Sequence, residues 1–224
     1  ASAGVVAGIA ALVLGSPALA AEGKGQLLRG AYRPVAKETS PRAAYHWELE
    51  NGVKEVVRDR VPARELAVVL VGDGASTVAD RLEVPFSGGA LLPSTVVVRV
   101  GTTLRMRNDD EIGHELYAEG LDGFSAEATS PKAIRSVHLT KAGSYALRDK
   151  LATHARAYLH VLPDLVAVAK LEPSGSFVFS DVPSGKYKLK VFHGGEIVSE
   201  RAVEVAEKNL TLDAVALGEA KASP

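Results

Sequence analysis

Apolar and polar residues alternate along much of the chain with the period of β-strands. Residues 66–71 form a continuous run of β-prone side chains that ends at a Gly-Asp-Gly turn, the pattern of a buried strand. Residues 95–100 form a second Val-rich run, after which Leu104 and Met106 alternate with two arginines. We therefore expect Leu104 and Met106 to face a core, because successive side chains of a strand point to opposite faces.

The same pattern recurs at close spacing after residue 130, bounded by Gly, Pro and Asp. The further expected strands are 135–140, 143–147, 157–161, 177–179 and 187–191. Many short strands separated by turns indicate an all-β fold of antiparallel sandwiches. Helix signals are poor, and the one moderate candidate after the N-terminal region is 153–157.

The first twenty residues carry no charge and resemble a secretory signal peptide. Residues 4–14 are almost entirely apolar, a Gly-Ser-Pro break follows, and Ala18-Leu19-Ala20 supplies the small residues of a cleavage site. The alternative is a short membrane anchor, but the apolar run is too short to cross a bilayer comfortably. We predict a signal peptide at 1–20, no membrane span after its cleavage, and a periplasmic or secreted protein.

Residues 21–63 are expected to form an N-terminal extension. Tyr45, Trp47 and Leu49 alternate before an Asn51-Gly52 turn, which predicts a hairpin packed across the sandwich, with the single Trp in the core.

Composition narrows the possible functions. The chain has no Cys, which excludes disulfides, so the fold must rest on its hydrophobic cores. Lys and Arg (26) nearly balance Asp and Glu (27) and are interspersed with them, so no basic stripe indicates nucleic acid as a partner. The catalytic motifs of serine hydrolases, phosphate-binding loops and zinc proteases are missing, and we predict that the protein is not an enzyme.

The C-terminal block has a specific repeat of aromatic, glycine and proline positions. It contains Phe177 and Phe179, a Val-Pro-Ser-Gly turn, and then Tyr187, Leu189 and Val191 alternating with lysines. This pattern resembles the carboxypeptidase-regulatory-like, transthyretin-like β-sandwich. The resemblance implies a non-catalytic domain, which we place at 163–217, followed by a disordered tail at 218–224.

Residues 64–162 resemble cupredoxins, in particular exported plastocyanin-like (methylamine-utilisation-like) proteins. The resemblance rests on the strand that leads through Gly101 to Met106, on the Asn-Asp-Asp corner that begins at Asn108 and leads to His114, and on the Gly-Ser-Tyr strand that ends at Asp149. It implies a Greek-key sandwich in front of the regulatory-like one.

The resemblance also locates the copper ligands, and most of them have been lost. His114 matches the first histidine, but Asp149 stands where the family has its cysteine and Ala152 where it has its second histidine, with His154 displaced by two positions. A thiolate is what makes a blue-copper centre, so no such centre is expected.

Two readings of these residues remain open. In one, His114 and His154 are ordinary polar residues on the loops at one end of the sandwich. In the other, His114, Asp149 and His154 form a cysteine-free site for Cu(II) or Zn(II), with Glu111 or Glu115 as a further ligand. In that case replacing His114 by Ala should abolish binding and leave stability almost unchanged, because a loop histidine at the rim holds little core. The four other histidines are given no metal role.

The sequence thus predicts an exported, non-enzymatic two-domain protein with a degenerate cupredoxin domain that acts in binding or scaffolding in the cell envelope. The expected partner is an envelope protein or a glycan, and no cofactor is expected. The alternative function is a periplasmic metal-binding protein that holds copper or zinc through His114, Asp149 and His154.

Overall fold

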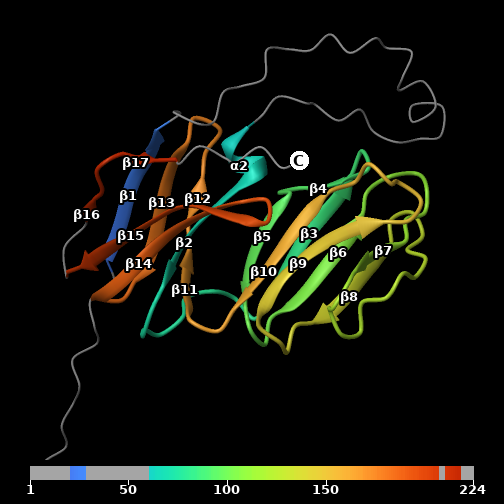
Figure 1. The fold of residues 1–224 in the computed structure, drawn as a ribbon, viewed down its shortest axis with the longest axis horizontal. Helices are drawn as coiled ribbons and strands as arrows, with labels where there is room; N and C mark the ends of the chain where they lie inside the picture. Colours follow the sequence, from blue (N-terminus) through green and yellow to red (C-terminus); the bar gives the residue numbers. More distant parts are fainter. Residues whose placement is uncertain (1–20, 29–60, 207–209, 218–224) are drawn as a thin grey trace, which may run out of the picture.

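The computed structural model describes residues 21–28, 61–206 and 210–217. These form seventeen strands and one short helix, α2 (Pro62–Glu65), which confirms the all-β fold (Figure 1). The predicted signal peptide, the hairpin with Trp47 and the C-terminal tail lie outside the described residues. No helix among the described residues is long and apolar enough to cross a membrane.

The strands between residues 81 and 162 form the first sandwich, on the right of Figure 1. One sheet has the order β4-β3-β6-β8 and the other β5-β10-β9-β7. The bounds are β3 (Arg81–Ser87), β4 (Ala90–Leu91), β5 (Thr95–Arg99), β6 (Thr103–Asn108), β7 (Leu116–Ala118), β8 (Ile134–His138), β9 (Gly143–Asp149) and β10 (Ala157–Leu162). Leu104 and Met106 are fully buried between the two sheets, as their alternation predicts.

The second sandwich combines the C-terminal strands with two strands from the N-terminal part of the chain. Its sheets have the orders β12-β13-β1-β16, with β17 also paired to β1, and β11-β2-β14-β15. The bounds are β1 (Ala21–Leu28), β2 (Leu66–Val71), β11 (Leu165–Val168), β12 (Lys170–Leu171), β13 (Ser176–Val182), β14 (Gly185–His193), β15 (Glu196–Val205), β16 (Leu210–Thr211) and β17 (Val215–Ala216). Phe177, Phe179, Tyr187, Leu189 and Val191 lie in its core, as predicted.

This pairing differs from the expected domain boundaries. The sequence analysis assigned β2 to the first sandwich and β1 to an extension, but β2 pairs with β14 and β11, and β1 pairs with β13. The first sandwich is therefore inserted between two parts of the second. Residues 163–173, which the sequence analysis placed at the start of the regulatory-like domain, contribute β11 and β12 to the second sandwich.

The expected helix at 153–157 is wrong. The segment is a turn that leads into β10 at Ala157, where the chain pairs with Leu147 of β9. Pairing along a buried strand outweighs a weak local helix preference, because its hydrogen bonds come with the burial of Ala157 and Leu159.

The two sandwiches share an apolar interface, and hydrogen bonds of His160 lie at its edge. Ala67, Val69 and Val71 of β2 cluster with Val97 of β5, and with Leu165 and Phe192 from the second sandwich. Beside them, buried His160 of β10 donates a hydrogen bond from Nε2 to the carbonyl oxygen of Gly194 (2.7 Å) and accepts one at Nδ1 from Ser144 Oγ (2.8 Å). Burial lowers the pKa of His160, so its ring is neutral and can serve as donor and acceptor at once.

Both sandwiches contain a tyrosine whose hydroxyl group hydrogen-bonds to a backbone carbonyl in the same way. Tyr145 Oη donates to the Lys141 carbonyl oxygen (3.2 Å) and Tyr187 Oη to that of Pro183 (2.9 Å), each four residues upstream, as in a tyrosine corner. A glycine stands two residues before each tyrosine, and a Cβ there would lie 2.8 Å from the hydroxyl oxygen. The glycine of the shared Gly-x-Tyr-x-Leu pattern therefore leaves room for the tyrosine hydroxyl in both domains.

We expect the variant Phe179→Ala to lower the free energy of unfolding by about 3–5 kcal/mol, because it removes a fully buried ring that packs against Phe177. Urea denaturation followed by circular dichroism measures the change. The control Lys188→Ala, at an exposed position on neighbouring β14, should stay within about 0.5 kcal/mol of wild type. Equal stability of the two variants would contradict the assignment of Phe179 to the core.

Candidate functional site

Three charged side chains meet inside the end of the first sandwich. His114 Nδ1 lies 2.6 Å from Asp149 Oδ2, and His114 Nε2 lies 3.2 Å from Asp110 Oδ2. All three residues are at most 3% exposed. The imidazole ring is thus held at both nitrogens by carboxylates, and we call Asp110, His114 and Asp149 the buried triad.

The two carboxylates also accept backbone hydrogen bonds. Asp149 Oδ1 accepts from the amides of Glu115 (3.1 Å) and Leu151 (2.9 Å). The oxygens of Asp110 accept from the amides of Gly88 (2.7 Å) and Gly89 (3.0 Å), on the turn between β3 and β4. The triad therefore joins both sheets of the sandwich, and both buried carboxylates are hydrogen-bonded on each oxygen, as such groups require.

The loop before His114 is fixed by the last residue of β6. Asn108 Nδ2 donates to the carbonyl oxygens of Ile112 (2.8 Å) and Thr129 (3.1 Å), and Asn108 Oδ1 accepts from the Asp110 amide (3.0 Å). The backbones of His114 and Thr129 pair in an isolated bridge. The Asn-Asp-Asp corner thus directs Asp110 and His114 inward, while Asp109 forms an ion pair with Arg107.

The electrostatics of the triad keep His114 charged. Burial by itself would lower its pKa, but the hydrogen bonds and charges of Asp110 and Asp149 raise the pKa to about 9. In return, the hydrogen bond from His114 and the backbone amides hold the pKa values of Asp110 and Asp149 below their usual range, against the opposing effect of burial. At neutral pH an imidazolium lies between two carboxylates.

This arrangement does not fit the copper or zinc ion that the sequence left open. A metal-binding histidine must offer a lone pair on a neutral ring, whereas both nitrogens of His114 carry protons that are donated to carboxylates. Both oxygens of Asp149 are also engaged. Among the described residues, no group of three or more His, Cys, Asp or Glu side chains is arranged to hold a metal ion.

The structure thus brings together two of the three predicted site residues, His114 and Asp149. His154 is exposed and lies over the turn at Gly89, where a Cβ would be 2.8 Å from its Nε2 atom. Glu111 instead forms an ion pair with Lys132 (2.7 Å), and Glu115 contributes its backbone amide to the triad. Neither glutamate acts as a further ligand to His114.

Asp110 is the member of the site that the sequence analysis missed, because it entered there only as part of the Asn-Asp-Asp corner. The available signal was its position four residues before His114, which the structure converts into a contact. Asp110 also accepts hydrogen bonds from the Gly88–Gly89 turn. The sequence does not show this contact, because the turn lies far from Asp110 in the chain.

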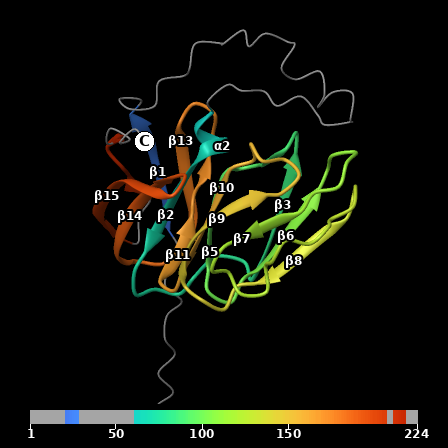
Figure 2. The same cartoon turned by 45° about the vertical axis from the view of Figure 1, so that its right-hand side comes forward.

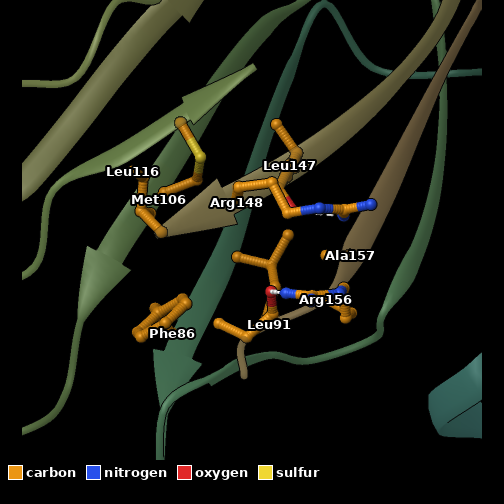
Figure 3. Close-up of a pocket in the computed structure, with 9 residues that line it drawn as sticks. Phe86, Leu91, Met106, Leu116, Leu147, Arg148, Arg156 and Ala157 are labelled. Atoms are coloured by element: carbon orange, nitrogen blue, oxygen red, sulfur yellow. Dashed lines mark hydrogen bonds between the residues drawn. The ribbon is translucent and has the colours of Figure 1, made fainter. Parts of the chain in front are cut away.

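A small apolar cavity lies beside the triad between the two sheets (Figure 3). Phe86, Leu91, Met106 and Leu147 are among its lining residues, and the Phe86 ring lies 4.4 Å from the His114 ring, centroid to centroid. Its volume is about 10 Å³, close to the room that a single water molecule needs. Arg148 and Arg156 also line it, so it opens toward the surface at this end of the sandwich.

The chain matches no known family profile and no curated protein. Among solved structures it is similar to a copper(I) form of an amicyanin mutant, with 21% identity over 42% of this chain and 97% of that chain and a TM-score of 0.34. Amicyanin from Paracoccus versutus is 19% identical over 42% of this chain and 96% of that chain, with a TM-score of 0.34. A copper-containing nitrite reductase from Thermus scotoductus gives 19% identity, 41% of this chain, 25% of that chain and 0.34. These likenesses cover less than half of the chain.

The structure reverses the expectation that His114 can be removed without loss. We expect His114→Ala to lower the free energy of unfolding by about 3–5 kcal/mol, because it leaves two buried carboxylates without their cation. Chemical denaturation at pH 7 measures the loss. The exposed His138 on β8 offers the matched control, and His138→Ala should be nearly neutral. Near-neutral behaviour of His114→Ala would show that the triad is not formed.

The triad also predicts how stability depends on pH. The pKa of His114 is about 9 in the folded protein and about 6.5 when unfolded, so its contribution is fully present below pH 6.5 and is lost as the pH rises through 9. This corresponds to about 3 kcal/mol between pH 6.5 and 9.5. In urea denaturation series at these two pH values, His114→Gln should be less stable than wild type and should lack this component. The same slope in both proteins would refute the charged triad.

Proposed function

We propose that the protein is a non-enzymatic binding or scaffolding protein of the cell envelope, whose first sandwich is a cupredoxin-like domain that does not use copper. The observation that carries this proposal is the buried triad. The positions that resemble copper ligands hold a histidine with both nitrogens donated to carboxylates and an aspartate where the thiolate would be. A residue set that satisfies itself in this way acts as a structural element.

The second sandwich supports the same proposal. Its sheets have the Phe-x-Phe and Tyr-x-Leu-x-Val strands that resemble the regulatory-like family, and these side chains are all used in packing. The shared apolar interface and the hydrogen bond from His160 to Gly194 hold the two sandwiches in a fixed relation. A rigid pair of sandwiches suits a protein that presents surfaces to a partner.

Export is part of the proposal. Cleavage after Ala20 would leave Ala21, the first residue of β1, as the mature N-terminus. The uncharged, apolar character of residues 1–20 and the lack of Cys in the chain fit a periplasmic or secreted protein.

A metal titration separates this function from the alternative. We expect calorimetric titration of the mature protein with Cu(II) and with Zn(II) at pH 7 to show no stoichiometric binding, and the copper mixture to lack the intense visible band of a Cu–thiolate bond. His138→Ala serves as the control for adventitious binding by an exposed histidine. Stoichiometric binding that is lost in both His114→Ala and His154→Ala, but kept in His138→Ala, would instead establish the metal-binding function.

A further inference from the structure

The outer face of the β5-β10-β9-β7 sheet contains an unusual row of side chains. Tyr117 of β7 pairs with Arg148 of β9, and because Leu116 and Leu147 face the core, both side chains point outward. Ala157, the first residue of β10, pairs with Leu147, so Arg156 lies just before β10, at the side of the sheet where β9 carries Arg148. Figure 3 shows both arginines on one side of the cavity. The row thus reads Tyr, Arg, Arg, from β7, from β9 and from the residue before β10.

A second tyrosine borders this row. Tyr158 pairs with Ala146 on the same outer face, and the guanidinium carbon of Arg148 lies 5.5 Å from the centre of the Tyr158 ring. The Tyr158 ring is also close to the turn between β14 and β15, where a Cβ on Gly195 would lie 3.0 Å from it. The second sandwich therefore helps to fix Tyr158 in place. We call Tyr117, Arg148, Arg156 and Tyr158 the arginine–tyrosine face.

The two arginines lack acidic partners within the described residues. Arg148 donates to the carbonyl oxygen of Leu147 (2.9 Å), and Arg156 donates to those of Thr153 (2.6 Å) and Ala155 (3.0 Å). Glu115 and Glu119 each lie two residues from Tyr117, but among the described residues neither forms an ion pair with Arg148 or Arg156, and the backbone of Glu115 lies opposite Lys150. Like charges close together repel each other, so this arrangement works against folding.

On the outer face of the other sheet, neighbouring arginines are paired with acidic side chains. Arg105 and Arg107 also lie side by side on a strand face, but Glu83 is 3.5 Å from Arg105 and 2.7 Å from Arg107. Asp109 forms a further ion pair with Arg107 (2.7 Å). Acidic residues of this chain therefore neutralise the arginines on that sheet, whereas no described acidic residue pairs with the arginines of the arginine–tyrosine face.

We propose that the arginine–tyrosine face docks an acidic segment of a partner protein. Tyrosine and arginine are the residues enriched at the centres of protein interfaces and among their energetic hot spots, and lysine and glutamate are depleted there. The free N–H groups of two adjacent guanidiniums match the oxygens of carboxylates. This proposal rests on the binding role proposed above and names the surface and the partner chemistry for it.

The test uses the mature protein and a short fluorescein-labelled peptide rich in glutamate, with the matching glutamine peptide as reference, followed by fluorescence anisotropy. We expect the glutamate peptide to bind more tightly than the glutamine peptide, and binding to weaken as salt is added. Arg156→Glu and Tyr117→Ala should each reduce the affinity, Arg156→Glu by at least about tenfold. Arg105→Ala, which removes an already paired arginine on the opposite sheet, should leave the affinity unchanged.

Thermal denaturation of the same variants keeps the test independent of misfolding. Arg156→Glu places a negative charge beside Arg148 in place of a positive one, so its melting temperature should equal or exceed that of wild type while the affinity falls. Unchanged affinity in Arg156→Glu, or binding of polygalacturonate in place of the peptide, would overturn the proposal. Neither result bears on the metal titration, so failure of this surface is distinguishable from failure of the proposed function.

Discussion

Two buried carboxylates that cannot remain unpaired determine the structure of one end of the first sandwich. Asp110 and Asp149 reach the interior from different sheets, and the protonated ring of His114 lies between them. Removing charges from water costs several kcal/mol for each ion, so the arrangement holds only because both carboxylates also accept hydrogen bonds from backbone amides. The Asn108 corner, the Gly88–Gly89 turn and the end of β9 are all fixed by this requirement.

A positive charge at this place has a clear chemical meaning. The proton on His114 gives its ring a positive charge between the two buried carboxylates of Asp110 and Asp149. The three side chains therefore form a structural ion cluster whose stability depends on pH.

The insertion of one sandwich into the other gives the surfaces of the protein their fixed geometry. Because β2 belongs to the second sandwich but lies against β5, the two domains share an apolar interface, and His160 connects them at its edge. Figure 2 shows the two sandwiches in contact along this side. The position of Tyr158 beside the β14–β15 turn follows from this contact, so the second sandwich helps to hold one residue of the arginine–tyrosine face in place.

The sequence by itself determined the fold class, most strands and the faces they bury, because alternation with period two is a local property. It also identified His114 and Asp149 as residues of one site, since the resemblance placed both at the same end of a sandwich. It could not assign β1 and β2 to the second sandwich, because pairing partners far apart in the chain leave no mark in local periodicity. Nor could it show the role of Asp110, or that Arg148 and Arg156 lie on the same side of the sandwich, since both depend on how separate strands are arranged. The near-zero net charge of the whole chain gave no sign of the local positive charge at Arg148 and Arg156, because only the tertiary structure decides which charges become neighbours.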